Sequence, residues 1–140
     1  LELIAGVSDG RSNPRIDGHY PAGPGQLLPV AQVPGWSRLQ ELQHAVVLRL
    51  DDDRDWFVPE SLEWHRAKGH SGVVICPMHM GGATTGFLGL AFRPRTAFDA
   101  DELQVVEALT SHAATALELV RLLETSKSAV LAEERSRTAQ

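Results

Sequence analysis

The chain has 140 residues, of which 43% are hydrophobic, and this is enough for the core of one domain but too short for two of ordinary size. Its net charge of −5 argues against a nucleic-acid-binding surface, which needs a basic stripe. A single cysteine excludes an internal disulfide framework and any cysteine-rich zinc site, and it is typical of a reducing compartment such as the cytoplasm.

The N-terminal quarter is expected to be one strand followed by a loop. Residues 1–7 are apolar and lead into a Ser-Asp-Gly turn, whereas residues 13–34 hold too many prolines and glycines for a long helix or a central strand. No apolar run reaches the ~18–20 residues that span a bilayer, so we expect no membrane contact in this chain. Because it opens with Leu1, we expect a piece of a longer protein, and that protein can carry a membrane anchor elsewhere.

The next segment predicts a short helix and a buried strand. Residues 37–44 form the helix, with Leu39 and Leu42 facing inward, and residues 45–50 form the strand. Three consecutive aspartates, residues 51–53, end that strand. Carboxylates bind hard cations, but calcium loops space their ligands and include glycine. We therefore interpret these aspartates as a solvated turn.

A second helix and a hairpin follow. Pro59 can occupy the first position of a helix within residues 55–67, and Gly69 is a suitable residue to follow its end. Residues 73–78 and 87–92 are apolar runs on either side of Gly81 and Gly82, which is the pattern of a β-hairpin. Pro77 is expected to end its strand or to lie where no partner needs its missing N–H.

The last segment predicts one very long helix that begins after Asp99. Asp99 and Glu102 have the spacing of a capping box, and Phe98 and Leu103 that of a hydrophobic staple. Residues 99–140 contain neither glycine nor proline, so the helix would reach about 60 Å. Its apolar arc is wider than packing on one sheet needs, which indicates a homodimer. The expected dimer interface consists of Val105, Leu109, His112, Ala116, Leu119, Leu123 and Val130.

These elements carry a resemblance to a known family. The strand ending in proline, the glycine turn, the GFLGL strand of residues 86–90, Phe98 before Glu102-Leu103, and the series Leu109, Ala113, Leu117 together resemble the C-terminal half of a GAF domain. Residues 131–139 resemble the start of the dimerisation segment of a bacterial sensor histidine kinase. We therefore expect a GAF-like domain over residues 1–124, lacking its first helix and strand, and a helical signalling linker over residues 125–140.

The resemblance implies an α+β fold, in which an antiparallel sheet is flanked by helices, and a sensory function without catalysis. In this interpretation the cytoplasmic domain binds a small molecule, and a ligand- or redox-dependent change passes through the long helix to a histidine kinase output. The residues expected to contact the ligand are Trp56, Trp64, Val74, Cys76 and Phe87. One alternative is a ligand-free module that only holds a dimer together.

The other alternative is a haem-based gas or redox sensor, and the sequence contains candidate ligands for it. Some GAF domains hold haem through one histidine, and His65 or His70 would be that ligand here. The sequence does not favour haem, because loop histidines without such a role are common. Cys76 is expected to be a small buried apolar side chain, and His112 a hydrogen-bonded histidine of the core or of the interface.

Overall fold

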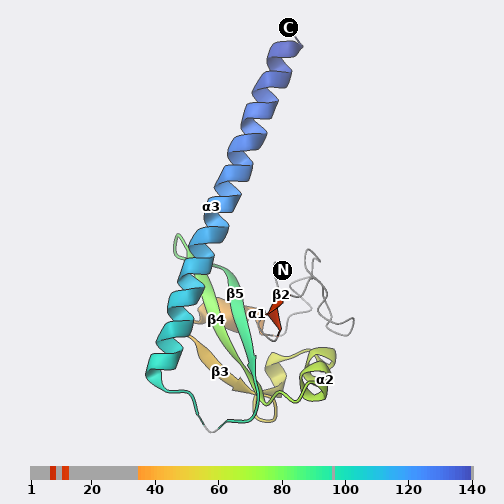
Figure 1. Cartoon of the computed structure of the whole chain (residues 1–140), viewed down its shortest axis with the longest axis vertical. Coiled ribbons are helices and arrows are strands. Elements are labelled where there is room, and N and C mark those ends of the chain that lie inside the picture. Colours follow the sequence, from red (N-terminus) through yellow and green to blue (C-terminus); the bar gives the residue numbers. More distant parts are fainter. Residues whose placement is uncertain (1–6, 9–10, 13–34, 96, 140) are drawn as a thin grey trace.

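The computed structural model describes residues 7–8, 11–12, 35–95 and 97–139. The predicted loop over residues 13–34 and most of the predicted strand over residues 1–7 lie outside them. At the N-terminal end, β1 (Val7–Ser8) and β2 (Arg11–Ser12) form a short antiparallel pair. The rest of the described chain builds a sheet, the helices that cover it and one long projecting helix (Figure 1).

The sheet has three antiparallel strands in the order β3 (Val46–Arg49), β4 (Gly72–Met80), β5 (Ala83–Phe92). The register places Val47 beside Val74 on one side of β4 and Ala91 beside Val73 on the other. Gly81 and Gly82 form the turn between β4 and β5 with φ angles of 58° and 80°, a backbone region that glycine adopts without a steric penalty. The predicted hairpin and the α+β class are therefore confirmed.

Pro77 does not end its strand, because β4 continues past it to Met80, so the second of the two alternatives predicted for it applies. Pro77 is buried and pairs with Phe87 of β5, whereas β3 pairs with β4 only as far as Ile75. On that side Pro77 lies beyond the last residue of the β3 ladder, so its missing N–H removes no bond to β3. A register shift between Met78 and His79 then leads into the hairpin turn.

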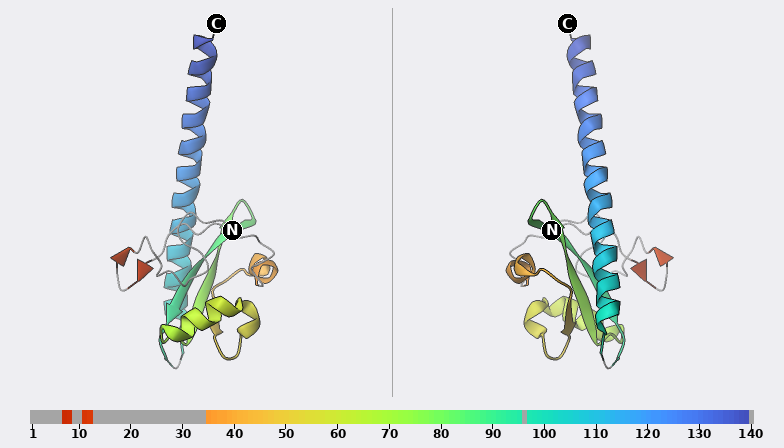
Figure 2. Two further views of the ribbon diagram at one scale, coloured as in Figure 1. Left: turned by 90° about the vertical axis from the view of Figure 1, so that its right-hand side faces the viewer. Right: turned by 90° about the vertical axis from the view of Figure 1, so that its left-hand side faces the viewer.

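Helices cover both faces of the sheet. On one side lie α1 (Trp36–Glu41), the 3-10 turn η2 (Arg54–Trp56) and α2 (Pro59–Ala67), and on the other lies α3 (Ala100–Thr138), as the two side views of Figure 2 show. Both short predicted helices are thus present. The central strand β4 lies between the two layers and contacts α3 directly.

Local signals set the limits of α2 and of the turn before it. Pro59 is the first residue of α2, and Gly69 follows its end with a φ of 74°. In the preceding turn, Asp53 Oδ2 accepts a hydrogen bond from Arg49 N at 2.8 Å. Asp51 Oδ1 lies 3.0 Å from Arg66 Nη2 of α2. Asp53 therefore bonds within the turn, and Asp51 joins the turn to α2.

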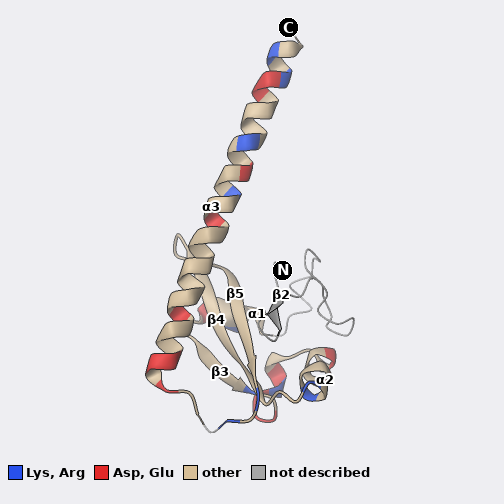
Figure 3. Ribbon diagram, in the orientation of Figure 1, with Lys and Arg blue, Asp and Glu red and all other residues tan. Residues whose placement is uncertain are grey.

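The long helix α3 starts as the capping pattern predicts. Glu102 N donates to Asp99 Oδ1 at 2.8 Å, and Asp99 N donates to Glu102 Oε2 at 3.0 Å. The 39 residues of α3 span about 58 Å at 1.5 Å per residue. Its buried residues are Val106, Thr110 and Ala114, so only the first third packs on the sheet. The remainder projects away from the domain and carries side chains of both charges (Figures 1 and 3).

Candidate functional site

The sheet face under α1 carries an aromatic cluster. Leu48, Val73 and Ile75 are buried in it, and Leu39 of α1 is only 2% exposed. Five partly buried side chains pack around these four: Trp36, Leu42, Trp56, Phe57 and Phe87. Arg38 Nη1 lies 2.6 Å from Asp55 Oδ2, and the Arg38 guanidinium lies over the Trp56 ring at 5.3 Å from its centroid. This ion pair joins α1 to η2 at the edge of the cluster.

Helix α3 covers the opposite face of the sheet, and two residues of the predicted ligand site lie on that face. Val74 and Cys76 are buried there with Val106, surrounded by partly buried Phe98 and Leu103. Successive residues of a strand point to opposite faces, so the neighbours of Val73 and Ile75 in β4 must face away from the aromatic cluster. Val74 and Cys76 therefore lie on the other face of the sheet from Trp56 and Phe87, and the structure does not bring the predicted ligand residues together.

The environment of Cys76 is that of an inert core side chain. The residue is 3% exposed, and its Sγ donates to the Pro77 carbonyl oxygen at 3.9 Å. Burial raises the pKa of the Cys76 thiol; a hydrogen bond with Thr110 partly offsets this effect, and Glu107 adds to it. A neutral buried thiol is a poor nucleophile, so the group does not supply an attachment point for a ligand on the aromatic face.

His65 and His70 come together at the end of α2. Their Nδ1 atoms are 3.0 Å apart, with the two rings 5.3 Å apart between centroids. His65 is 7% exposed, and its ring meets Phe57 and Trp64 edge-on at centroid distances of 6.0 and 5.0 Å. Burial, with a smaller contribution from His70, lowers the pKa of His65 from 6.5 to about 4. His65 is thus held as a neutral imidazole within the fold.

The packing of His65 does not suit an axial haem ligand. The Nδ1 atoms of His65 and His70 share a hydrogen bond with each other, and the His65 ring is enclosed by aromatic neighbours. Binding a haem iron would require His65 to leave that packing. Trp64 also lies with this pair, 5.7 Å from the His70 ring, rather than within the cluster that holds Trp56 and Phe87. His65 and His70 therefore contact each other through their Nδ1 atoms at the end of α2.

Along α3, the predicted interface residues form an exposed row, which we call the seam. It comprises Val105, Leu109, His112, Ala116, Leu119, Leu123 and Val130. The five large aliphatic members are exposed by between 53% and 62% in the single chain. His112 is exposed as well, so the prediction that it lies in the core of this chain is wrong and only the interface alternative remains.

Sequence reasoning missed two members of the aromatic cluster, Trp36 and Phe57. A signal was present for Trp36, because it precedes Leu39 by three residues and so shares its helix face. Phe57 follows η2 in extended backbone, and no periodic pattern marks it. The aromatic face is therefore richer in rings than the sequence indicated.

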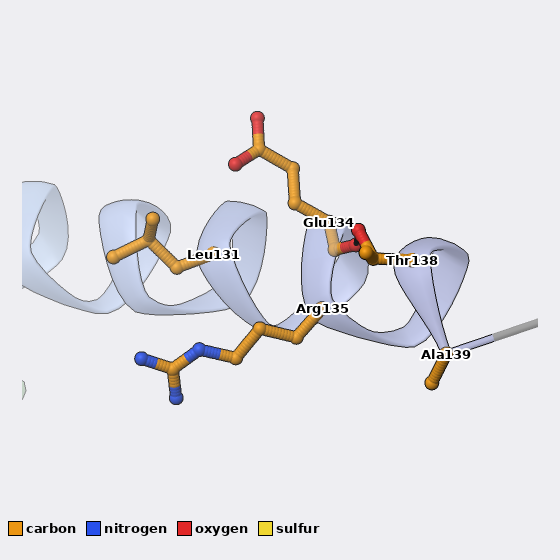
Figure 4. A pocket seen from close by; sticks show the side chains of 5 residues that line it. All are labelled: Leu131, Glu134, Arg135, Thr138 and Ala139. Atoms are coloured by element: carbon orange, nitrogen blue, oxygen red, sulfur yellow. Dashed lines mark hydrogen bonds between the residues drawn. The ribbon is translucent and has the colours of Figure 1, made fainter.

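A surface hollow lies at the far end of α3 (Figure 4). It is lined by Leu131, Glu134, Arg135, Thr138 and Ala139. All five belong to the last turns of one helix, so no second element encloses a small molecule there, and we assign no ligand site to it. Across the described ranges, no helix is long and apolar enough to cross a membrane, and no three His, Cys, Asp or Glu side chains gather to hold a metal ion.

Comparison with solved structures shows the same fold in signalling proteins. The GAF domain of a two-component sensor histidine kinase from Bacillus halodurans aligns with a TM-score of 0.60 at 20% identity, over 84% of this chain and 80% of that one. A domain of a putative two-component sensor histidine kinase from Sinorhizobium meliloti 1021 gives 0.52 at 14% identity, over 61% and 59%. The phycocyanobilin-bound GAF domain of a cyanobacterial phytochrome gives 0.51 at 17%, over 76% and 64%.

No curated protein sequence matches the chain. The family model described as the GAF domain matches residues 4–118, well over half of the chain. That range contains both faces of the sheet, the aromatic cluster and the part of α3 that packs on β4. The chain therefore belongs to the GAF domain family.

Proposed function

We propose that this GAF domain is the sensory and dimerisation module of a signalling protein. In this proposal it passes a ligand- or redox-dependent change through α3 to a histidine kinase output. The observation that carries it is the position of β4: Val73 and Ile75 pack in the aromatic cluster, whereas Val74 and Cys76 pack against α3. A ligand that displaces β4 from the aromatic side would therefore also displace the helix.

The stiffness of α3 supports transmission over a distance. Residues 99–140 lack glycine and proline, and α3 is one unbroken helix from Ala100 to Thr138. Val106 and Thr110 fix its first turns to the sheet, so a rotation at that end reaches the projecting end. Two packings of such a helix that differ by a few kcal/mol would form the switch.

The second part of the proposal is a homodimer through the seam. Burial of a half-exposed aliphatic side chain contributes about 1 kcal/mol, so five in each of two copies contribute about 10 kcal/mol. Association itself costs roughly 4–15 kcal/mol, so the seam would give a dimer that dilution can dissociate. Val105 and Val130 bound the seam and lie about 38 Å apart along the helix.

Cysteine cross-linking and sedimentation test the dimer. In a parallel pair, Leu119→Cys places two thiols face to face, and we expect a disulfide-linked dimer under mild oxidation. Thr125→Cys is the matched control, because Thr125 lies on the side of α3 opposite the seam and should not cross-link. The native Cys76 is buried and does not interfere. A monomer by sedimentation at high concentration, with no cross-link in either variant, would contradict the dimer.

A thermal-shift screen tests the sensory part. A ligand at one hundred times its dissociation constant stabilises the fold by about 2.7 kcal/mol. We would screen nucleotides, small metabolites, haemin and biliverdin, and expect the effect of a true ligand to disappear when Trp56 or Phe87 is replaced by alanine. If no compound stabilises the protein, the ligand-free dimerisation module is the better description. A Soret band that is lost in His65 and His70 variants would instead support a haem sensor.

A further inference from the structure

The seam contains one ionisable side chain, His112, whose position has a consequence for the dimer. On its own helix the neighbours three and four residues away are uncharged: Ala108, Leu109, Thr115 and Ala116. The carboxylates nearest to it in sequence have other partners, since Glu107 accepts from Ala45 N at 2.8 Å and Glu118 pairs with Arg121 at 2.6 Å. His112 is exposed in the single chain. What a second copy places opposite it therefore decides its environment.

The spacing of the seam determines which residue of the second copy lies opposite His112. From Val105 to Val130 the seam advances by alternating steps of four and three residues once Ser126 is included, which is the heptad spacing of a two-stranded coiled coil. His112 and Ser126 are its two polar layers. A parallel, in-register pair sets each layer against its own copy, so His112 meets the partner's His112. An antiparallel pair would set His112 against an apolar layer and leave it without a hydrogen bond, at a cost of about 1–3 kcal/mol.

A pair of neutral imidazoles is a self-complementary contact. Each ring carries one N–H donor and one acceptor nitrogen, so two rings related by a two-fold axis can share one N–H···N hydrogen bond. The chain already contains one such contact, between His65 and His70 with nitrogens 3.0 Å apart. When both rings of a pair are protonated, each has donors only and the two positive charges repel.

We propose that His112 and the partner's His112 form a hydrogen-bonded pair that sets the parallel register of the dimer at neutral pH and weakens the dimer when it is protonated. This rests on the dimer proposed above and adds its register and a pH-dependent control. Histidine changes charge between about pH 5 and 8, so the effect lies within a physiological range. The remaining seam positions are uncharged and give no competing titration.

Sedimentation of the whole chain between pH 7.5 and pH 5.5 tests the pair. We expect the dimer dissociation constant of the native chain to rise more than tenfold on acidification. His112→Leu should bind more tightly and lose most of this rise. His112 is exposed, so this change does not threaten the fold. His44→Gln is the matched control: His44 is an exposed histidine outside the seam, paired with Glu107, and its removal should leave the pH response intact.

The possible results separate the two proposals. A chain that stays monomeric at every pH overturns the dimer and the histidine pair together. A dimer whose pH response persists unchanged in His112→Leu overturns the pair alone, because the dimer would then titrate through another group. A tenfold response that is present in the native chain and in His44→Gln, and lost in His112→Leu, supports the pair.

Discussion

Replacement of Val74 by alanine tests how α3 is held on the sheet. Val74 is 1% exposed, lies on the central strand and packs with Cys76 and Val106. The change removes two carbon atoms, worth about 0.8 kcal/mol each in transfer free energy. A residual cavity of roughly 40 Å³ adds about 1 kcal/mol, because the backbones of β4 and α3 limit collapse. We expect the free energy of unfolding to fall by about 2–3 kcal/mol.

Urea unfolding followed by two probes measures this loss. The three tryptophans, Trp36, Trp56 and Trp64, lie on other parts of the structure than the α3 face, whereas far-UV circular dichroism reports chiefly on α3. If the domain unfolds as one unit, both probes should give the same midpoint, and Val74→Ala should shift the two together.

The control is the same substitution on the exposed side of α3. Val105 is 58% exposed in the single chain, so Val105→Ala should change the stability of dilute protein by less than about 0.5 kcal/mol. A loss below 1 kcal/mol for Val74→Ala, or an equal loss for both variants, would refute the packing of α3 against β4 described above.

Two further predictions concern the sheet and the histidine contact. A Cβ at Gly72 would collide with the Leu48 carbonyl oxygen and the Phe92 ring, whereas one at Gly89 would find its nearest neighbour at 3.7 Å. Gly72→Ala should therefore cost more than about 2 kcal/mol in urea unfolding and Gly89→Ala less than 1, and equal costs would disprove this close approach. The lowered pKa of His65 means that the unfolded chain binds more protons between pH 6.5 and 4, so stability is complete above pH 6.5 and falls as the pH decreases. The free energy of unfolding, measured by denaturant titration, should be lower by about 2–3 kcal/mol at pH 4, and His65→Phe should remove most of this loss. If the His65→Phe variant keeps the pH profile of the native chain, another group is responsible.

Much of the fold followed from local sequence signals. The capping pair Asp99 and Glu102, the proline that begins α2 and the glycines of the hairpin each act within a few residues. These features were predicted because caps and turns depend on backbone groups close in sequence. The sequence left two alternatives open at Pro77. Whether a missing N–H breaks a ladder depends on where β3 stops, and this is set by pairing between distant segments.

The candidate site could be predicted only in part. Trp56 and Phe87 do share the aromatic cluster, but Val74 and Cys76 were assigned to it although they face α3. An apolar strand that is buried on both faces shows no polar alternation, so its sequence does not say which residues face which layer. The contact between His65 and His70 is local but was not predicted; Gly69 ends α2 with a φ of 74°, and His70 N donates to the His65 carbonyl oxygen at 3.0 Å.

The sequence by itself determined that this chain ends in a single long helix with a wide apolar arc, because periodicity, capping and the lack of glycine and proline are properties of the segment alone. Only the tertiary structure decided which part of that arc is buried against the sheet and which part stays exposed. Packing on β4 buries the side that holds Val106, Thr110 and Ala114 and leaves the seam with His112 exposed. The sequence shows how wide the apolar arc of the helix is, but it does not show which part of the arc packs against the sheet. That depends on the elements that lie beside the helix in the folded domain.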